Sequence, residues 1–295
     1  MSTRLLAQQL GLIEVIPVDK SDVQKHNIQI FDYLIILDFE ATCWNKHDPQ
    51  KGFAEIIEFP AVFYSIKQNK ILQEFQQYVM PTEKPKLSLF CTELTGITQD
   101  KVDEGVPLQT SLMLFIKWIR NLTNKHNLAF ETHCLDFKKK KCALVTWSDW
   151  DLGTCLYNEC KRKRISKPDV FNRWIDLRAL YKQPRFTRIC SLLSDFHSDK
   201  EKFLTKKDYF CKKLTKTVDK DFNQYELQTT NLINLEHYNR RPKGLNGALS
   251  ELGLTFEGKE HCGLDDAKNT ASLARKMIAE GVLLRITKDL NVNCL

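Results

Sequence analysis

The sequence of 295 residues has little of three things: long apolar runs, paired cysteines and secretion signals. No run of about 18 apolar residues exists, which excludes an ordinary transmembrane helix, so we expect no membrane partner. The first residues have neither a long apolar core nor a small-residue cleavage site, so we expect no secretory signal peptide. These absences favour a globular protein inside the cell.

The ten cysteines contain no C-x-x-C pair and no zinc-ribbon spacing, which argues against a disulfide framework and against structural zinc. Cys43, Cys91, Cys142 and Cys155 lie in apolar stretches, where a reduced thiol packs as a small core residue. We therefore expect free thiols in a reducing compartment, and an intracellular location in the cytoplasm, the nucleus or both.

The composition is that of an ordinary globular protein, with 42% hydrophobic and 27% charged residues. The formal net charge of +7 suits a polyanionic partner without requiring one. Two basic runs, at 138–141 and 161–164, are typical of a solvated loop and a helix end. Contact with phosphates, or a role as a nuclear import signal, stays open for both runs.

Two acidic side chains end an early apolar strand. The run at 34–37 is followed by Asp38, Phe39 and Glu40, and strand side chains alternate between faces, so both carboxylates point the same way. Two carboxylates that project together repel each other unless a proton or a cation lies between them. The pattern alone is weak, because D-x-E after an apolar strand also occurs by chance.

Further acids and one histidine stand at the ends of later elements. Asp151 opens one amphipathic segment, and His261 lies five residues before Asp266, which falls in the first turn of another. Hydrolysis of a phosphodiester by two metal ions needs such oxygen ligands. The set predicts Asp38, Glu40, Asp151 and Asp266 as metal ligands, and His261 as the general base. Each later residue also has a plain alternative: Asp151 as a helix cap, Asp266 as a dipole-favoured acid, His261 as a surface residue.

Hydrophobic periodicity predicts a chain in which an antiparallel meander precedes alternating helices and strands, which indicates an α/β fold with a mixed sheet. We expect strands at 33–39, 58–66, 72–80, 143–147 and 174–177. We expect helices at 87–94, 107–125, 150–163, 244–252 and 265–280, with Asp149 as a cap of the third.

Three segments fall outside this pattern. Residues 1–30 form an N-terminal extension, with a short helix possible at 5–12, and 291–295 form a tail. Residues 183–238 are polar and rich in Lys, Asp and Thr. We interpret them as an insertion, disordered or loosely helical, that interrupts a catalytic domain spanning 31–290, because long loops without structure are uncommon in compact domains.

The acidic motifs and the histidine resemble those of the DEDDh branch of the 3′→5′ exonucleases, and more closely those of the Eri-type exoribonucleases. The resemblance rests on the stretches at 38–44 (DFEATCW), 55–60 (EIIEFP) and 261–266 (HCGLDD). Within that family, the residues at 31–33, 147–151 and 241–245 are most similar to the second vertebrate branch.

The resemblance implies an RNase H-like fold, with a mixed five-stranded sheet flanked by helices. It implies two Mg²⁺ ions, which Mn²⁺ can replace, and release of nucleoside 5′-monophosphates from a 3′ end. It places the metal ligand at Asp151 rather than Asp149, and at Asp266 rather than Asp265. The pocket of the terminal nucleotide is then lined by Glu40, Ala41, Leu152 and His261, with the segment at 94–97 nearby.

The expected partner is single-stranded or 3′-overhanging RNA. A preference for DNA ends is the first alternative, since sugar choice depends on contacts to the 2′-hydroxyl that the sequence does not reveal. A non-catalytic nucleic-acid-binding form, disabled by the 183–238 insertion, is the second. The intact set of acids and the histidine favours an enzyme, and the oligomeric state stays open.

Overall fold

The computed structural model describes residues 29–130, 136, 138–182 and 244–290. The expected helix at 5–12, the insertion at 183–238 and the tail at 291–295 lie outside the described residues and stay predictions, as does nearly all of the extension. No helix in the described part of the chain is long and apolar enough to cross a membrane.

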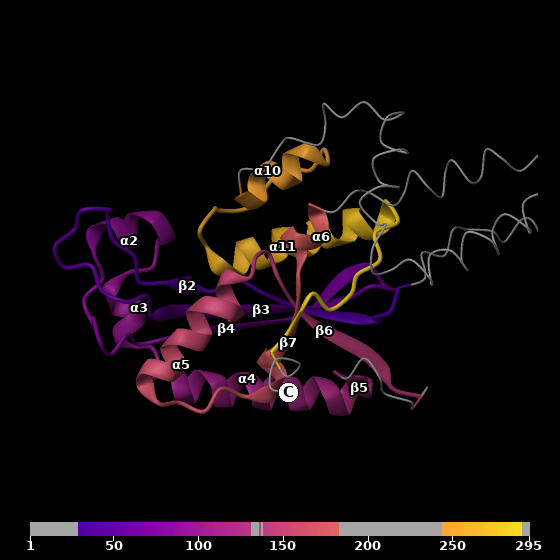
Figure 1. Ribbon diagram of the computed structural model, residues 1–295, viewed down its shortest axis with the longest axis horizontal. Helices are drawn as coiled ribbons and strands as arrows, with labels where there is room; N and C mark the ends of the chain where they lie inside the picture. The colour runs from indigo at the N-terminus through magenta and orange to yellow at the C-terminus, as the bar shows by residue number, and fades with distance from the viewer. Residues whose placement is uncertain (1–28, 131–135, 137, 183–243, 291–295) are drawn as a thin grey trace, which may run out of the picture.

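A mixed β-sheet forms the middle layer of the fold (Figure 1). Its path runs β2-β3-β1-β6-β7-β8, with β4 paired to β3 and β5 paired to β6. The five longer strands are β1 (Tyr33–Leu37), β3 (Ile56–Ser65), β4 (Lys70–Tyr78), β6 (Lys140–Thr146) and β7 (Arg173–Asp176). The three two-residue strands are β2 (Glu40–Ala41), β5 (Leu128–Ala129) and β8 (Lys288–Asp289).

The predicted α/β class and mixed sheet are confirmed, but the predicted number of strands is wrong. The described residues form eight strands rather than five, because the three two-residue strands extend the five longer ones. A strand of two residues is too short to show a period of two in its hydrophobic pattern, so the sequence carries no signal for it. Asn69 lies in the turn between β3 and β4 and has a positive φ of 55°.

Strand β1 lies at the centre of the sheet, antiparallel to β3 and parallel to β6. Its side chains alternate between two hydrophobic cores: Ile35 and Leu37 belong to one, and Leu34 and Ile36 belong to the other. A strand buried on both faces reads as a continuous apolar run rather than an alternating one, which is the pattern at 34–37.

Helices cover both faces of the sheet (Figure 1). On one face lie α4 (Leu108–His126) and α5 (Tyr157–Lys163), and on the other lie α6 (Leu177–Tyr181), α10 (Gly244–Glu251) and α11 (Gly263–Ala279). The shorter helices are α2 (Leu89–Thr95), α3 (Gln99–Asp103) and the 3₁₀ turn η2 (Asp169–Asn172). The predicted helix stop at Gly96 is confirmed, since this residue has a φ of 75° and its N–H reaches the Thr92 carbonyl.

The segment at 150–163 differs from its prediction as a single α-helix. It begins as a π-helix, η1 (Trp150–Leu156), and continues as α5. Asp149 occupies the predicted N-cap position, but its side chain makes no cap hydrogen bond and instead lies 3.1 Å from the Lys288 ammonium group. Short π-helical turns are frequent at functional sites, and this one carries Asp151.

Candidate active site

The strand end after β1 carries the first two site residues. Leu34 and Ile36 point into the core that also contains residues of α11, and Asp38 is the next residue on that side. Glu40 follows in β2, where it pairs with Glu58 of β3. The charge of Glu40 contributes to the raised pKa of Asp38, so the two carboxylates lie near each other, and their common direction stays a prediction.

Asp151 reaches this strand end from η1. Its side chain is buried, with 3% of its surface exposed, and its Oδ1 accepts a hydrogen bond of 2.9 Å from the amide of Phe39. Phe39 lies between Asp38 and Glu40 in the chain, so this bond fixes the second motif directly against the first. Asp151 therefore lies against the first motif, whereas Asp149 pairs with Lys288, and the role of Asp151 as a metal ligand stays a prediction.

Helix α11 brings the third motif to the same place. A Cβ added to Gly263, its first residue, would lie 2.6 Å from the carbonyl oxygen of Asp38, so only glycine allows this approach. Asp266 lies in the first turn, where its N–H donates to the Cys262 carbonyl at 2.9 Å. Both the loop position of His261 and the first-turn position of Asp266 are confirmed.

His261 is exposed and has a φ of 63°, in the left-handed region that non-glycine residues rarely adopt. Its backbone lies close enough to the Asp266 carboxylate to lower the pKa of that group. The strained residue is thus next to an acid of the site, while its side chain is exposed to solvent. Strain of this kind gathers at functional sites.

Four carboxylates therefore meet at one edge of the sheet, and we call them the site carboxylates: Asp38, Glu40, Asp151 and Asp266. Burial, followed by the charges of the neighbouring carboxylates, raises the pKa of Asp38 well above its ordinary value. The same causes raise the pKa of Glu40 to about 9 and that of Asp266 to about 7. Burial also raises the pKa of Asp151 to about 7, against the bond from Phe39.

The site carboxylates fit a hard divalent cation by their chemistry. They are oxygen donors, which Mg²⁺ prefers, and their mutual repulsion is what a nearby cation relieves. Within the described residues, no three side chains of His, Cys, Asp or Glu are arranged so that they could hold a metal ion. Metal binding by the site carboxylates therefore stays a prediction.

Glu58 is a fifth carboxylate at this edge, and the prediction of site residues missed it. It is 1% exposed, and its charge contributes to the raised pKa values of Asp38 and Glu40. One signal could have found it. In β3, alternation places Glu58 on the same face as Pro60 and Val62, where an acid inside an apolar strand has to be buried.

The predicted nucleotide-pocket residues lie around this edge. Ala41 is buried in β2, and its carbonyl accepts from the Cys91 thiol of α2 at 3.7 Å. The end of α2 approaches the loop before α11, since Lys259 lies against Gly96. Leu152 is fully buried in the core on the α4 side, so its contact with a nucleotide stays a prediction.

Two residues of the second basic run, at 161–164, form contacts within the fold. Lys163 lies 2.6 Å from Glu55 and 2.7 Å from Glu159, both fully buried acids. Arg162 donates to the Ala54 carbonyl at 2.8 Å. The predicted helix end is confirmed, since Lys161, Arg162 and Lys163 lie in the last turn of α5, and Lys163 also neutralises two buried acids there.

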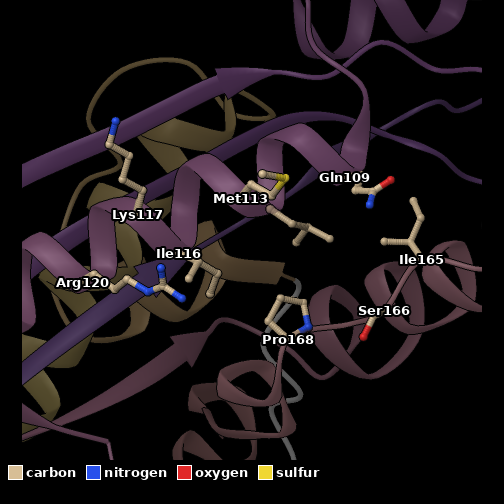
Figure 2. Close-up of a pocket in the computed structure, with 9 residues that line it drawn as sticks. Gln109, Met113, Ile116, Lys117, Arg120, Ile165, Ser166 and Pro168 are labelled. Carbon is tan, nitrogen blue, oxygen red and sulfur yellow. The ribbon is translucent and has the colours of Figure 1, made fainter.

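A separate cavity of about 310 Å³ lies on the α4 face (Figure 2). Side chains of α4 and of residues 165–168 lie on opposite sides of it (Figure 2). Its charged lining residues are Lys117 and Arg120, and none of its lining residues is a carboxylate. It is therefore unsuited to divalent cations and distinct from the site carboxylates.

Known proteins resemble the chain in both sequence and structure. A model of the exonuclease family matches residues 35–202. "ERI1 exoribonuclease 2" of Xenopus laevis is 44% identical over 303 residues, which cover 99% of this chain and 35% of that protein. The "3′-5′ exonuclease Snipper" of Drosophila melanogaster is 38% identical over 317 residues, which cover 97% of this chain and 94% of that protein.

Among solved structures, the nuclease domain of 3′hExo, "a DEDDh family member, bound to rAMP", is 29% identical with a TM-score of 0.59. The match covers 88% of this chain and 98% of that one, and it supports the predicted RNase H-like fold. The chain spans only 35% of the length of the Xenopus and human proteins named "ERI1 exoribonuclease 2".

Proposed function

Because this chain belongs to the exonuclease family, we propose that it is a metal-dependent 3′→5′ exoribonuclease that releases nucleoside 5′-monophosphates. The observation that carries the proposal is the meeting of the site carboxylates from three separate segments of the chain. Their order along the chain and their place at the strand and helix ends match the D-x-E, D and H-x4-D motifs.

The site carboxylates are the proposed ligands of two Mg²⁺ ions, with Mn²⁺ as a substitute. Ions bound there would activate a water and stabilise charge on the leaving oxygen. Asp38 stands on the stiff end of β1, which suits a ligand shared by both ions. The Phe39 amide orients Asp151 through their hydrogen bond, and the first turn of α11 orients Asp266.

His261 is the proposed general base. Its exposed side chain lies on the loop before α11, and its backbone is close enough to Asp266 to lower the pKa of that carboxyl, so the imidazole can take a proton from a water near that acid. Glu40 has the longer side chain of the first motif and can face the terminal nucleotide, with Ala41 and Leu152 beside it.

RNA is the proposed substrate, either single-stranded or with a 3′ overhang. Support comes from relatives named exoribonucleases, and from a solved 3′-exonuclease, 29% identical with a TM-score of 0.59, whose description concerns recognition of a histone mRNA stem-loop. Action on DNA ends is the second candidate, since the Drosophila relative is named an exonuclease without mention of RNA. An intracellular site of action is proposed on the reduced cysteines.

The test is incubation of the purified chain with labelled single-stranded RNA and DNA, in Mg²⁺ or in EDTA. We expect RNA to shorten from its 3′ end in Mg²⁺ and to stay intact in EDTA, with nucleoside 5′-monophosphate as product. Asp151→Asn should abolish the reaction, whereas its matched neighbour Asp149→Asn should retain it. Equal shortening of DNA would move the proposal to the second candidate, and no shortening of either would reject it.

A further inference from the structure

Glu58 occupies an unusual place for a carboxylate. It lies inside β3 with 1% of its surface exposed, directly across the ladder from Glu40. On the same face of β3, Val62 and Tyr64 pack in the core that contains α11, and Figure 1 shows α11 lying along that face of the sheet. A buried charge of this kind is costly unless its oxygens find hydrogen-bond donors.

Both oxygens of Glu58 find such donors. Oε1 accepts from the Gln76 side chain of β4 at 2.6 Å, and Oε2 accepts from the backbone amide of Gly263 at 3.2 Å. Gly263 is the first residue of α11, and Cys262 at the N-cap position makes no side-chain cap bond. Glu58 therefore supplies, from a distant strand, the acceptor that a cap residue usually supplies to the first helical amides.

The helix start is enclosed on two sides by this arrangement. A Cβ on Gly263 would lie 2.6 Å from the Asp38 carbonyl oxygen and 3.2 Å from Glu58 Oε2. Asp266 follows within the first turn, and His261 precedes Gly263 by two residues. Any shift of the Gly263 amide would thus move a proposed metal ligand and the proposed base together, relative to Asp38.

We propose that Glu58 is a positioning residue, which docks the first turn of α11 so that Asp266 and His261 meet the strand bearing Asp38. This inference rests on the proposed function, since it assigns Glu58 a part in that site. Its negative charge also suits the positive end of the helix dipole, where an anion is favourable. Gln76 in turn orients the Glu58 carboxylate from the neighbouring strand β4.

Two variants separate positioning from direct metal ligation. Glu58→Gln keeps an oxygen that can accept from the Gly263 amide, and the Gln76 amide can turn to meet the new NH₂ group. Glu58→Ala removes both hydrogen bonds. A positioning residue tolerates the first change and not the second, whereas a ligand that must be charged fails in both.

Glu74→Ala is the matched control. Glu74 lies in β4 two residues before Gln76, and its carboxylate pairs with Lys268 of α11 at 3.1 Å, partly exposed. It links the same helix to the same sheet without touching the first helical amide. We expect this variant to behave as the wild-type chain, because exposed ion pairs contribute little.

The experiment measures Mn²⁺ affinity by calorimetry, hydrogen exchange at 258–268, and kcat/KM on 3′-labelled RNA, all on the full chain. Glu58→Ala should lose about 10- to 100-fold in both Mn²⁺ affinity and kcat/KM, the usual range for a group that orients metal ligands, and should exchange faster at the start of α11. Glu58→Gln should stay within about threefold, since its hydrogen bond is kept.

Unchanged Mn²⁺ affinity in folded Glu58→Ala would overturn the inference, and so would equal losses in Glu58→Gln and Glu58→Ala. If Glu58→Ala does not fold, Gln76→Ala takes its place, with a smaller loss in the same three measurements expected and no loss contradicting the inference. If the wild-type chain shortens RNA and Glu58→Ala matches it in all three measurements, only the positioning role is rejected. If the wild-type chain does not shorten RNA but Glu58→Ala lowers the Mn²⁺ affinity, the proposed exonuclease activity is rejected. The positioning role of Glu58 is then kept.

Discussion

The described part of the chain contains two groups of acidic side chains that differ in whether a lysine lies between the acids. In the lysine-paired cluster, formed by Glu55, Glu159 and Lys163, the ammonium group lies 2.6 and 2.7 Å from the two acids. Burial raises the pKa of Glu55, but Lys163 and the backbone amides of residues 82–84 outweigh it and leave that pKa below its ordinary value. The positive charge that balances these two acids is therefore the side chain of Lys163 itself.

Among the site carboxylates, Asp151 is buried like these acids, whereas Asp38, Glu40 and Asp266 are half-buried, and none has such a partner in the described part of the chain. Within the described residues, no lysine or arginine forms a salt bridge with any of them, and burial together with mutual repulsion raises their pKa values. Acids paired with a lysine have their counter-charge within the fold, whereas acids without one favour a bound cation. The difference agrees with the proposed metal-binding role of the site carboxylates.

The largest expected effect comes from removing one charge of the site carboxylates. Asp38→Asn should reduce RNA shortening to background while leaving the fold intact, because it removes a metal ligand and also relieves repulsion. Rate measurements and a thermal melt of the same sample check both parts. Retained turnover would remove Asp38 from the metal site and weaken the contrast between the clusters.

A smaller loss is expected at the proposed base. His261→Ala should lower kcat by about 10²–10⁴, the range for a positioned acid–base group, with RNA binding retained. Single-turnover rates together with binding of RNA in Ca²⁺ separate the two quantities. A near-normal rate would exclude His261 as the base and leave its left-handed backbone without a catalytic reason.

Breaking the lysine-paired cluster should lower the free energy of unfolding. Lys163→Met leaves two buried acids without their cation, so we expect the free energy of unfolding to fall by about 3–5 kcal/mol in urea titrations. The exposed neighbour Lys161→Met should change it by less than about 0.5 kcal/mol. Similar values for both variants would mean that the buried pair contributes nothing beyond a surface lysine.

The smallest effects, in pH dependence, should have opposite signs at Asp151 and Asp266, whose pKa values are raised, and at Glu55, whose pKa is lowered. Asp151 and Asp266 have raised pKa values of about 7, so the folded state binds more protons than the unfolded one near neutrality. In EDTA, stability should therefore fall as the pH rises through that value. Glu55 has a lowered pKa, so its contribution is lost only as the pH falls below about 4.5. Urea titrations from pH 4 to 8 test both signs, and a flat profile near pH 7 contradicts the first.

Much of the site could be predicted from the sequence, because its residues stand where local patterns are strong. The apolar run of β1 fixes the direction of Asp38 and Glu40, and Gly263 with the periodic residues of α11 places Asp266 in a first turn. Glu58 was missed because its partners, Gln76 and Gly263, lie 18 and 205 residues away in the chain. Contacts across such distances leave no local pattern.

The other misses have the same origin. Lys163 belongs to a charge run that is typical of a solvated helix end, and only the acids from β3 and α5 make it a buried cation. The π-helix at Trp150 has ordinary helical sequence, and the bond from Phe39 to Asp151 is a tertiary contact that periodicity does not reveal. Local patterns predicted the elements, while the contacts between them decided which acids are structural.

The most direct test of the central claim is a thermal melt of the chain with and without Mn²⁺ or Mg²⁺. A ligand at 100 times its Kd stabilises a folded protein by about 2.7 kcal/mol, so the wild-type Tm should rise clearly with the ion. Lys163→Met should show the same rise from a lower starting Tm, and Asp38→Asn should show little or none. An unchanged wild-type Tm, or an undiminished rise in Asp38→Asn, would contradict a metal site at the site carboxylates.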